Sequence, residues 1–250
     1  MMSYGRFAEV YDTLMKDVPY EQWVQFTNKR IKTYFSNAGT ILDLGAGTGE
    51  ITIRLSEQGF QVSGVDLSEE MLSIAERKSN LHNQSIQWLK QDITNLEVHE
   101  KYDVIISYCD VLNYITDDLD VQKVFQSVYD SLEPGGLFMF DVHSIGYVEH
   151  VLKNQTFGVV YDDVSYIWFC DEGEAPHTVH HDLTFFVKND QHYERFDEYH
   201  TQRTQSVDDY SQWLNDIGFT IRGIHADFSD ETGYDELEND RIFFVCQKLK

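Results

Sequence analysis

Short apolar runs alternate with amphipathic stretches along the first 150 residues of the chain. The runs have the length of buried strands, and the stretches between them have the apolar spacing of helices. The expected strands cover residues 40–44, 61–65, 86–89, 102–108 and 137–142, and the expected helices cover residues 19–37, 48–58, 70–80 and 117–132. Such alternation predicts parallel strands with helices on both faces of the sheet.

The pattern changes after about residue 150, where aromatic and β-branched residues dominate. The strands expected in this segment are residues 161–169, 179–187 and 191–201. Asn189 and Asp190 are typical of a hairpin turn. One helix and two strands are then expected at residues 207–217, 219–226 and 241–247. Because no helix separates the last two strands, we expect them to be antiparallel neighbours.

Taken together, these elements predict an α/β fold. Its core is a doubly wound, seven-stranded, mostly parallel sheet with an antiparallel last strand, and an inserted antiparallel sheet acts as a lid. The predicted main domain comprises residues 1–150 and 202–250, of which residues 1–37 form an N-terminal helical lid. The predicted insert comprises residues 151–201.

The charge balance narrows the classes of partner. Acidic residues outnumber basic residues by 43 to 19, which gives a formal net charge of −24. Such a surface repels phosphate backbones and anionic lipids, so we expect neither nucleic acid nor a membrane as partner. No stretch approaches the roughly 20 apolar residues of a membrane span, and the first residues lack an apolar signal core. Since the cysteines are also few and far apart, we expect a cytoplasmic protein, and the oligomeric state stays open.

The strongest chemical signal is a glycine turn between the first expected strand and the helix after it. Gly45, Gly47 and Gly49 are spaced G-x-G-x-G, with Ala46 between the first two and Asp43 just upstream. Turns of this kind let backbone N–H groups approach a ligand at a helix N-terminus. A dinucleotide fingerprint instead reads G-x-G-x-x-G and accommodates a pyrophosphate, whereas an acid at position 43 suits a cationic ligand.

Two further acids close the next two strands, at points where an adenosine can bind. Asp66 lies 19 residues after Gly47, and a carboxylate there can accept both ribose hydroxyls. Gln91, Asp92 and Ile93 follow the next strand. An acid at this point can accept a hydrogen bond from an adenine amino group, and the isoleucine can pack on the ring.

These motifs together resemble the class I (Rossmann-like) S-adenosylmethionine (SAM)-dependent methyltransferase family, in its bacterial small-molecule form. The resemblance covers residues 40–142 by sequence and residues 206–250 by architecture. It implies that residues 43–49 cradle the methionine part of SAM, that Asp66 holds the ribose and that Asp92 meets the adenine. It also implies cofactor contacts by Leu67, Met71, Gln91, Ile93, Cys109, Asp110 and Asn113.

The aromatic residues of the N-terminal segment carry a second, shorter resemblance. Tyr4, Tyr11 and Trp23 are placed as in the opening of bacterial small-molecule and amine methyltransferases. This implies a segment that folds over bound SAM, with a tyrosine near the methionine carboxylate or the sulfonium. An aromatic face beside a sulfonium gains about 0.5–2 kcal/mol. The alternative is that these residues only pack a helix onto the domain.

Methyl transfer needs little from a protein beyond positioning, because the sulfonium is already activated. An amine acceptor needs only to be neutral, whereas a hydroxyl needs a base. His143 lies just beyond the strand at residues 137–142 and is the candidate base, with Tyr114 as the second candidate catalytic residue. The alternative is that His143 is a hydrogen-bonded structural histidine.

The acceptor is left open by the sequence. Residues 151–200 hold ten aromatic residues and three basic ones, which favours a small apolar or cationic molecule methylated on nitrogen or oxygen. The spacing of His177, His180 and His181 matches no closed metal site, so no metal is expected. Two alternatives remain: a nicotinamide-dependent oxidoreductase on a related sheet, which the glycine spacing disfavours, and a non-catalytic SAM-binding protein.

Overall fold

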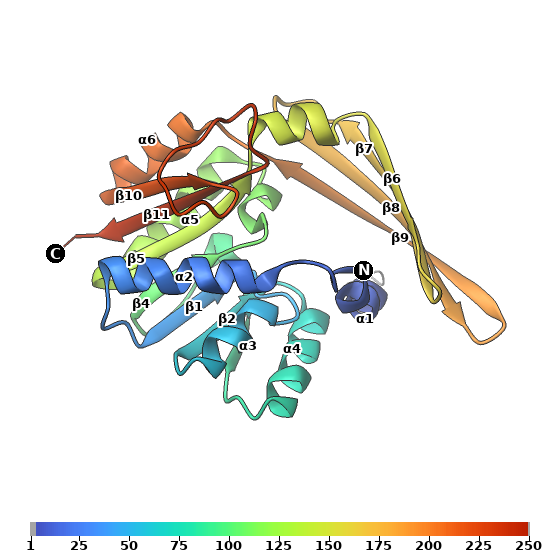
Figure 1. The fold of residues 1–250 in the computed structure, drawn as a ribbon, viewed down its shortest axis with the longest axis horizontal. Helices are drawn as coiled ribbons and strands as arrows, with labels where there is room; N and C mark the ends of the chain where they lie inside the picture. Colours follow the sequence, from blue (N-terminus) through green and yellow to red (C-terminus); the bar gives the residue numbers. More distant parts are fainter. Residues whose placement is uncertain (1–3, 250) are drawn as a thin grey trace.

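The structure is a computed structural model that describes residues 4–249, except for the side chains of residues 4–7 and 9. Its main sheet has seven strands in the order β10-β11-β5-β4-β1-β2-β3 (Figure 1). The strands are β1 (Thr40–Leu44), β2 (Gln61–Asp66), β3 (Gln87–Lys90), β4 (Tyr102–Ser107), β5 (Leu132–His143), β10 (Phe219–Ala226) and β11 (Arg241–Lys248). β11 lies between β5 and β10 and runs antiparallel to both, whereas β1 to β5 pair in parallel.

Helices cover both faces of this sheet, as the strand–helix alternation predicts. The helices are α2 (Tyr20–Tyr34), α3 (Glu50–Glu57), α4 (Glu69–Leu81), α5 (Asp118–Ser131) and α6 (Val207–Ile217). Successive side chains of a strand point to opposite faces. Leu137 and Met139 of β5 therefore join the core under α2 and α3, and Phe138 and Phe140 join the core under α5 and α6.

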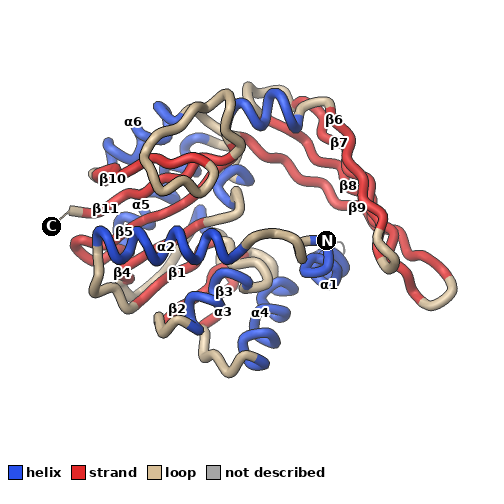
Figure 2. The backbone as a smooth tube through the Cα atoms, in the orientation of Figure 1, coloured by secondary structure: helices blue, strands red, loops and turns tan. Residues whose placement is uncertain are grey.

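A second sheet follows β5 after a π-helical turn, η3 (Tyr147–Leu152). Its strands are β6 (Gln155–Val160), β7 (Val164–Glu172), β8 (Thr178–Asn189) and β9 (His192–Arg203), antiparallel and in sequence order. Figure 2 shows it as a long ladder that leans away from the main sheet. The first helix, α1 (Tyr4–Leu14), contacts both α4 and β9, so it bridges the space between the two sheets.

The predicted fold class is confirmed, and several local boundaries differ from the structure. The strand predicted at residues 161–169 is β7, which begins at Val164, and residues 161–163 form the turn before it. β5 begins at Leu132, and not at residue 137 as predicted, because Leu132 already pairs with Tyr102 of β4. Pro134, Gly135 and Gly136 therefore lie within the strand. β6 was not predicted, because Gly158 and the polar residues 155–156 hide its alternation. Finally, α2 ends at Tyr34, short of residue 37. Across the described residues, no helix is both long and apolar enough to cross a membrane.

We expect Phe140→Ala to lower the free energy of unfolding by about 3–5 kcal/mol, because it empties a packed site. The Phe140 ring is fully buried and lies 4.7 Å from the Phe244 ring, centroid to centroid, in a stack. The matched control is Phe169→Ala, since Phe169 is 44% exposed on the second sheet. Urea denaturation measures both, and equal losses would contradict this account of the core.

Candidate active site

A tight turn joins the end of β1 to the start of α3. The backbone N–H groups of Gly45 and Ala46 donate to the carbonyl oxygen of Val65, at 2.8 and 2.9 Å. These two bonds tie the turn to the end of β2. The turn therefore lies at the carboxyl edge of the parallel strands, where open α/β sheets bind their ligands.

The three glycines of the turn all have positive φ. A Cβ added to Gly45 would lie 2.4 Å from a methyl carbon of Val111, and one added to Gly49 would lie 2.7 Å from the Trp88 ring. Gly47 differs, because an added Cβ there meets no heavy atom within 4 Å. The turn is thus closely packed at both ends and open in the middle, where a ligand can approach its backbone.

Asp43 is buried beneath the turn. Its Oδ2 accepts a 2.6 Å hydrogen bond from Thr52 Oγ1 on α3. Burial raises the pKa of Asp43 to about 7, and the bond from Thr52 opposes that shift. Near neutral pH this carboxyl is close to its midpoint of titration, so a cation in the pocket would favour its charged form.

Asp66 ends β2 and accepts backbone hydrogen bonds on both oxygens. Gly47 N lies 2.8 Å from Oδ2, and Ser68 N lies 2.9 Å from Oδ1. Burial raises the pKa of Asp66, while the bonds from Ser68 and Gly47 lower it. A carboxylate has about four lone-pair sites, so both oxygens can still accept from a ligand. Leu67 beside it is 66% exposed, and Met71 in the first turn of α4 is buried.

The third predicted strand end lies directly beside the second. The backbone N–H of Gln91 donates to the carbonyl oxygen of Asp66 at 3.1 Å, and its side chain bonds the backbone of Glu97. Asp92 is exposed, and its Oδ1 caps the 3-10 turn Ile93–Asn95. Ile93 packs against the main core. The structure therefore brings Asp66, Asp92 and Ile93 to one edge, as the sequence predicts.

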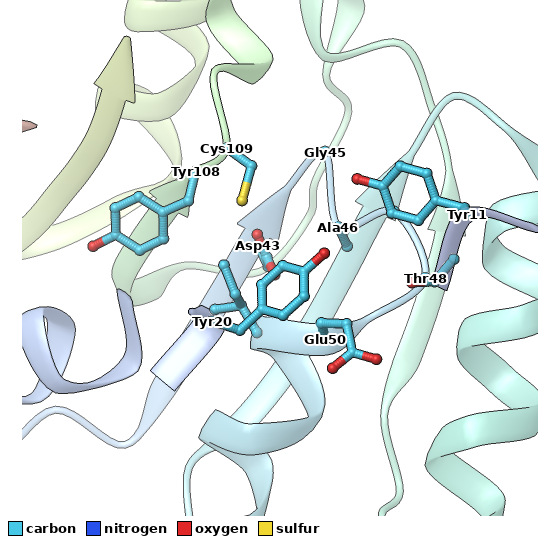
Figure 3. A pocket seen from close by; sticks show the side chains of 11 residues that line it. Tyr11, Tyr20, Asp43, Gly45, Ala46, Thr48, Glu50, Tyr108 and Cys109 are labelled. Carbon is cyan, nitrogen blue, oxygen red and sulfur yellow. The ribbon is translucent and has the colours of Figure 1, made fainter. Parts of the chain in front are cut away.

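A pocket opens above the glycine turn (Figure 3). Tyr11 and Tyr20 line it from the N-terminal segment, Asp43 and the turn line its base, and Tyr108 and Cys109 line it from the end of β4. The hydroxyl groups of Tyr11 and Tyr20 are hydrogen-bonded to each other. Burial raises the pKa of both tyrosines, so both are neutral phenols. The pocket thus offers aromatic rings and carboxyl groups.

α1 is held over this pocket by polar contacts at both of its sides. Asp12 accepts a 2.6 Å hydrogen bond from Thr48 Oγ1 of the turn. It also forms an ion pair with Lys78 of α4, whose Nζ lies 2.9 Å from its carboxylate. Just beyond the helix, Lys16 Nζ lies 4.1 Å from the centre of the Tyr161 ring, in the turn between β6 and β7. The segment that carries Tyr11 is therefore fastened to the main sheet on one side and to the second sheet on the other.

The turn after β4 depends on a buried carboxylate on β5. Cys109 and Asp110 both have left-handed φ, of 59° and 54°. Their backbone N–H groups donate to Asp141, at 2.8 and 3.3 Å. Arg241 of β11 pairs with Asp141, and its Nη2 lies 2.9 Å from Asp110 Oδ1. Asp141 thereby fixes a turn that L-residues rarely adopt.

His143 ends β5 next to this turn. Its Nε2 lies 3.5 Å from Asp110 Oδ2, and its ring stacks on Tyr147 with centroids 4.8 Å apart. Burial favours the neutral form of Asp110, but its interactions with His143 and Arg241 outweigh that effect and hold the pKa of Asp110 below its usual range. Asp110 is therefore an anion held between two basic groups, one of which is the predicted base.

Other predicted site residues lie apart from the pocket. Trp23 is buried on α2 and donates from Nε1 to Asp141 at 3.2 Å, so it packs in the core. Asn113 is buried, and its Oδ1 accepts from the backbone N–H of His143 at 2.9 Å. Tyr114 is half exposed, with its ring near that of His200. The side chain of Tyr4 lies outside the described residues.

Sequence reasoning missed Asp141 and Arg241. The one available signal was the carboxylate inside the apolar run 137–142, because a buried acid requires a partner. Within residues 4–249, no group of three or more His, Cys, Asp or Glu side chains is arranged to hold a metal ion.

Comparison with known proteins agrees with this geometry. A family model described as a methyltransferase domain matches residues 41–136. A Geobacillus sp. (strain WCH70) protein named as a methyltransferase is 43% identical over 99% of this chain and 100% of its own length. YqeM of Bacillus subtilis (strain 168), also named as a methyltransferase, is 42% identical over 100% of this chain and 98% of its own.

A solved structure of a SAM-dependent methyltransferase from Clostridium acetobutylicum ATCC 824 has a TM-score of 0.88 at 32% identity, and the match covers 99% of both chains. The chain belongs to the class I SAM-dependent methyltransferases. This methyltransferase therefore uses SAM as its cofactor, and its own residues fit that molecule. The turn is open at Gly47, Asp66 can accept hydroxyls, and the pocket presents carboxyl groups and aromatic rings to a cation.

We expect Asp43→Asn to change how the stability of the methyltransferase depends on pH. The folded chain keeps a proton on Asp43 up to about pH 7, whereas the unfolded chain loses it near the ordinary pKa of an aspartate, 3.8. Between those values the wild type should therefore lose stability relative to the variant as pH rises, by up to about 1.4 kcal/mol per pH unit. Above pH 7 the difference should be constant.

Urea denaturation of both proteins from pH 4.5 to pH 8 measures this difference. Asp190→Asn is the matched control, because Asp190 is exposed in the turn between β8 and β9. A constant difference between wild type and Asp43→Asn across the whole range would contradict the raised pKa.

Proposed function

We propose that this methyltransferase methylates a nitrogen or oxygen atom of a small-molecule acceptor. The observation that carries the proposal is the direct succession of two sites along the turn after β4. Tyr108 and Cys109 line the pocket above the glycine turn, and the next residue, Asp110, faces His143. The turn after β4 thus lines the cofactor pocket and also holds Asp110, the partner of the proposed base on β5.

The residues around the glycine turn have distinct parts in this proposal. When bound, SAM would supply an activated methyl group, and its sulfur would retain the bonding electron pair. Asp66 would hold the ribose hydroxyls and Asp92 the adenine amino group, while the turn at 45–49 would cradle the methionine part. Tyr11 would face the cationic part of the cofactor from the N-terminal side, because its ring lines the pocket there.

His143 is the proposed base. An acceptor N–H or O–H must lose its proton for a neutral methylated product to form, and the imidazole can take it. The anionic Asp110 at 3.5 Å would stabilise the resulting imidazolium. Tyr114 is the second candidate catalytic residue, since it is half exposed and directly follows Asn113, whose side chain accepts from the His143 N–H.

The second sheet supports a small and uncharged or cationic acceptor. Residues 151–200 carry ten aromatic residues and three basic ones, and β9 contacts both α1 and the turn Val111–Tyr114. Few cations are therefore present to bind an anionic acceptor. The net charge of −24 opposes a nucleic acid or an anionic membrane as substrate.

We expect Asp66→Asn to weaken SAM binding roughly 10- to 100-fold, because a charged acceptor of hydroxyl hydrogen bonds is lost. The matched control is Asp117→Asn. Like Asp66, Asp117 accepts two nearby backbone N–H groups, at 2.9 and 3.2 Å, but it caps α5 away from the pocket. Calorimetry with SAM and with its demethylated product measures both variants. Equal affinities for Asp66→Asn and the wild type would remove Asp66 from the cofactor site.

We expect His143→Gln to lower methyl transfer by about 100-fold or more while leaving the SAM dissociation constant within about twofold. The assay measures the demethylated cofactor formed with a panel of small amines and phenols. His150→Gln is the control, because His150 is exposed seven residues further along. If the panel yields a substrate and His143→Gln turns it over at the wild-type rate, His143 is not the base.

A further inference from the structure

A line of buried polar side chains runs from the second sheet to Asp110, outside the cofactor pocket. Trp168 on β7 has its Nε1 3.0 Å from Nδ1 of His181 on β8. His181 Nε2 lies 3.0 Å from Oε1 of Gln202 on β9. Gln202 Nε2 lies 2.7 Å from Asp110 Oδ2. His181 and Gln202 are both buried, so water does not compete for these bonds.

The chemistry of the two ends fixes the direction of every bond in this line, because an indole N–H can only donate and a carboxylate can only accept. Nδ1 of His181 must therefore be the bare nitrogen, and Nε2 must carry the proton. That proton points to the Gln202 oxygen, which leaves the Gln202 amide N–H to donate to Asp110. Burial lowers the pKa of His181 to about 4, which agrees with a neutral ring of one tautomer.

The line therefore ends on Asp110 as an acceptor. Asp110 Oδ1 accepts from Arg241 at 2.9 Å, and Oδ2 accepts from Gln202. The remaining neighbour of Oδ2 is His143 Nε2, at 3.5 Å. A carboxylate favours an N–H facing it, so the neutral His143 ring should hold its proton on Nε2 and leave Nδ1 bare. A bare nitrogen is what a base needs.

The end of β9 also restrains the backbone of His143. Thr204 Oγ1 donates to the His143 carbonyl oxygen at 2.6 Å. The His143 N–H donates to Asn113, and Asn113 Nδ2 donates to the carbonyl oxygen of Arg203 at 2.9 Å. Residues 203 and 204 thus restrain the backbone of His143, and Gln202 acts on its ring through Asp110.

We propose that Gln202 and His181 are positioning residues for methyl transfer, which hold Asp110 in place and thereby keep His143 in the tautomer with a bare Nδ1. The inference rests on the proposed function, in which His143 is the base. It assigns the second sheet a task beyond enclosing the acceptor. The inner side chains of three neighbouring strands would set the protonation pattern of a residue on the main sheet.

The test is nitrogen NMR of the full chain labelled with 15N-histidine and bound to the demethylated cofactor. The shifts of the two ring nitrogens report which one carries the proton. Gln202→Met keeps the length of the side chain and removes both of its hydrogen bonds. We expect His143 to change from a single tautomer with the proton on Nε2 to a mixture of both tautomers.

Thr201→Val is the matched control. Thr201 neighbours Gln202 on β9, its side chain points to the opposite face, and its Oγ1 bonds His180 at 3.0 Å. This variant loses a hydrogen bond of the same sheet without touching the line, so the His143 shifts should equal those of the wild type. A merely structural role for Gln202 predicts the same unchanged shifts for Gln202→Met, together with a lower melting temperature.

His181→Phe provides an independent variant in case Gln202→Met does not fold. It keeps a ring of similar size and removes the donor that holds Gln202 Oε1, so we expect His143 to populate both tautomers. An unchanged His143 in folded Gln202→Met, or an unchanged His143 in folded His181→Phe, would overturn the proposal. Failure of the proposed function looks different, because His143→Gln would then turn over its acceptor at the wild-type rate, while the tautomer of His143 is still read from the histidine spectrum.

Discussion

The buried carboxylate of Asp141 is the interaction on which the rest of the site depends. It lies within β5, fully buried, and an unpaired anion there would cost several kcal/mol. Four groups from distant parts of the chain satisfy it: the Trp23 indole, the backbone N–H groups of Cys109 and Asp110, and the Arg241 guanidinium. Helix α2, the turn after β4 and strand β11 are thus joined at one point. The conformational cost of the left-handed backbone in that turn is offset by the hydrogen bonds that its N–H groups donate to Asp141.

The pocket beside this point combines a preference for cations with a cost in stability. Asp43 is buried with a pKa of about 7, so keeping it charged at neutral pH works against folding. The glycine turn adds positive φ values and leaves Gly47 without packing partners for a side chain. Both features weaken the free protein and suit a positively charged ligand that must approach the backbone closely. The stability that the free protein loses through these two features is regained when such a ligand binds to the folded state.

The sequence predicted what depends on local pattern and missed what depends on distant pairs. Strand and helix order, the glycine turn and the acid that closes β2 could be predicted because each is visible within a few residues. The ion pair of Asp141 with Arg241 joins residues 100 positions apart, and no periodicity in the sequence predicts it. Trp23 has the aromatic character expected of a pocket residue, yet the register of α2 turns it toward Asp141. Gln202 was missed because polar residues are common near strand ends, and its bonds to His181 and Asp110 are visible only in the folded structure.

The way in which α1 is held in place determines how it responds to salt. The charged contacts of this segment are the ion pair between Lys78 and Asp12 and the contact of Lys16 with the Tyr161 ring, and both are partly exposed to solvent. Dissolved ions screen such contacts and hardly reach the buried Asp141. Ionic strength therefore acts on the charged contacts of α1 and leaves the buried turn after β4 unchanged. Salt is thus a means to loosen one wall of the pocket without disturbing the opposite wall.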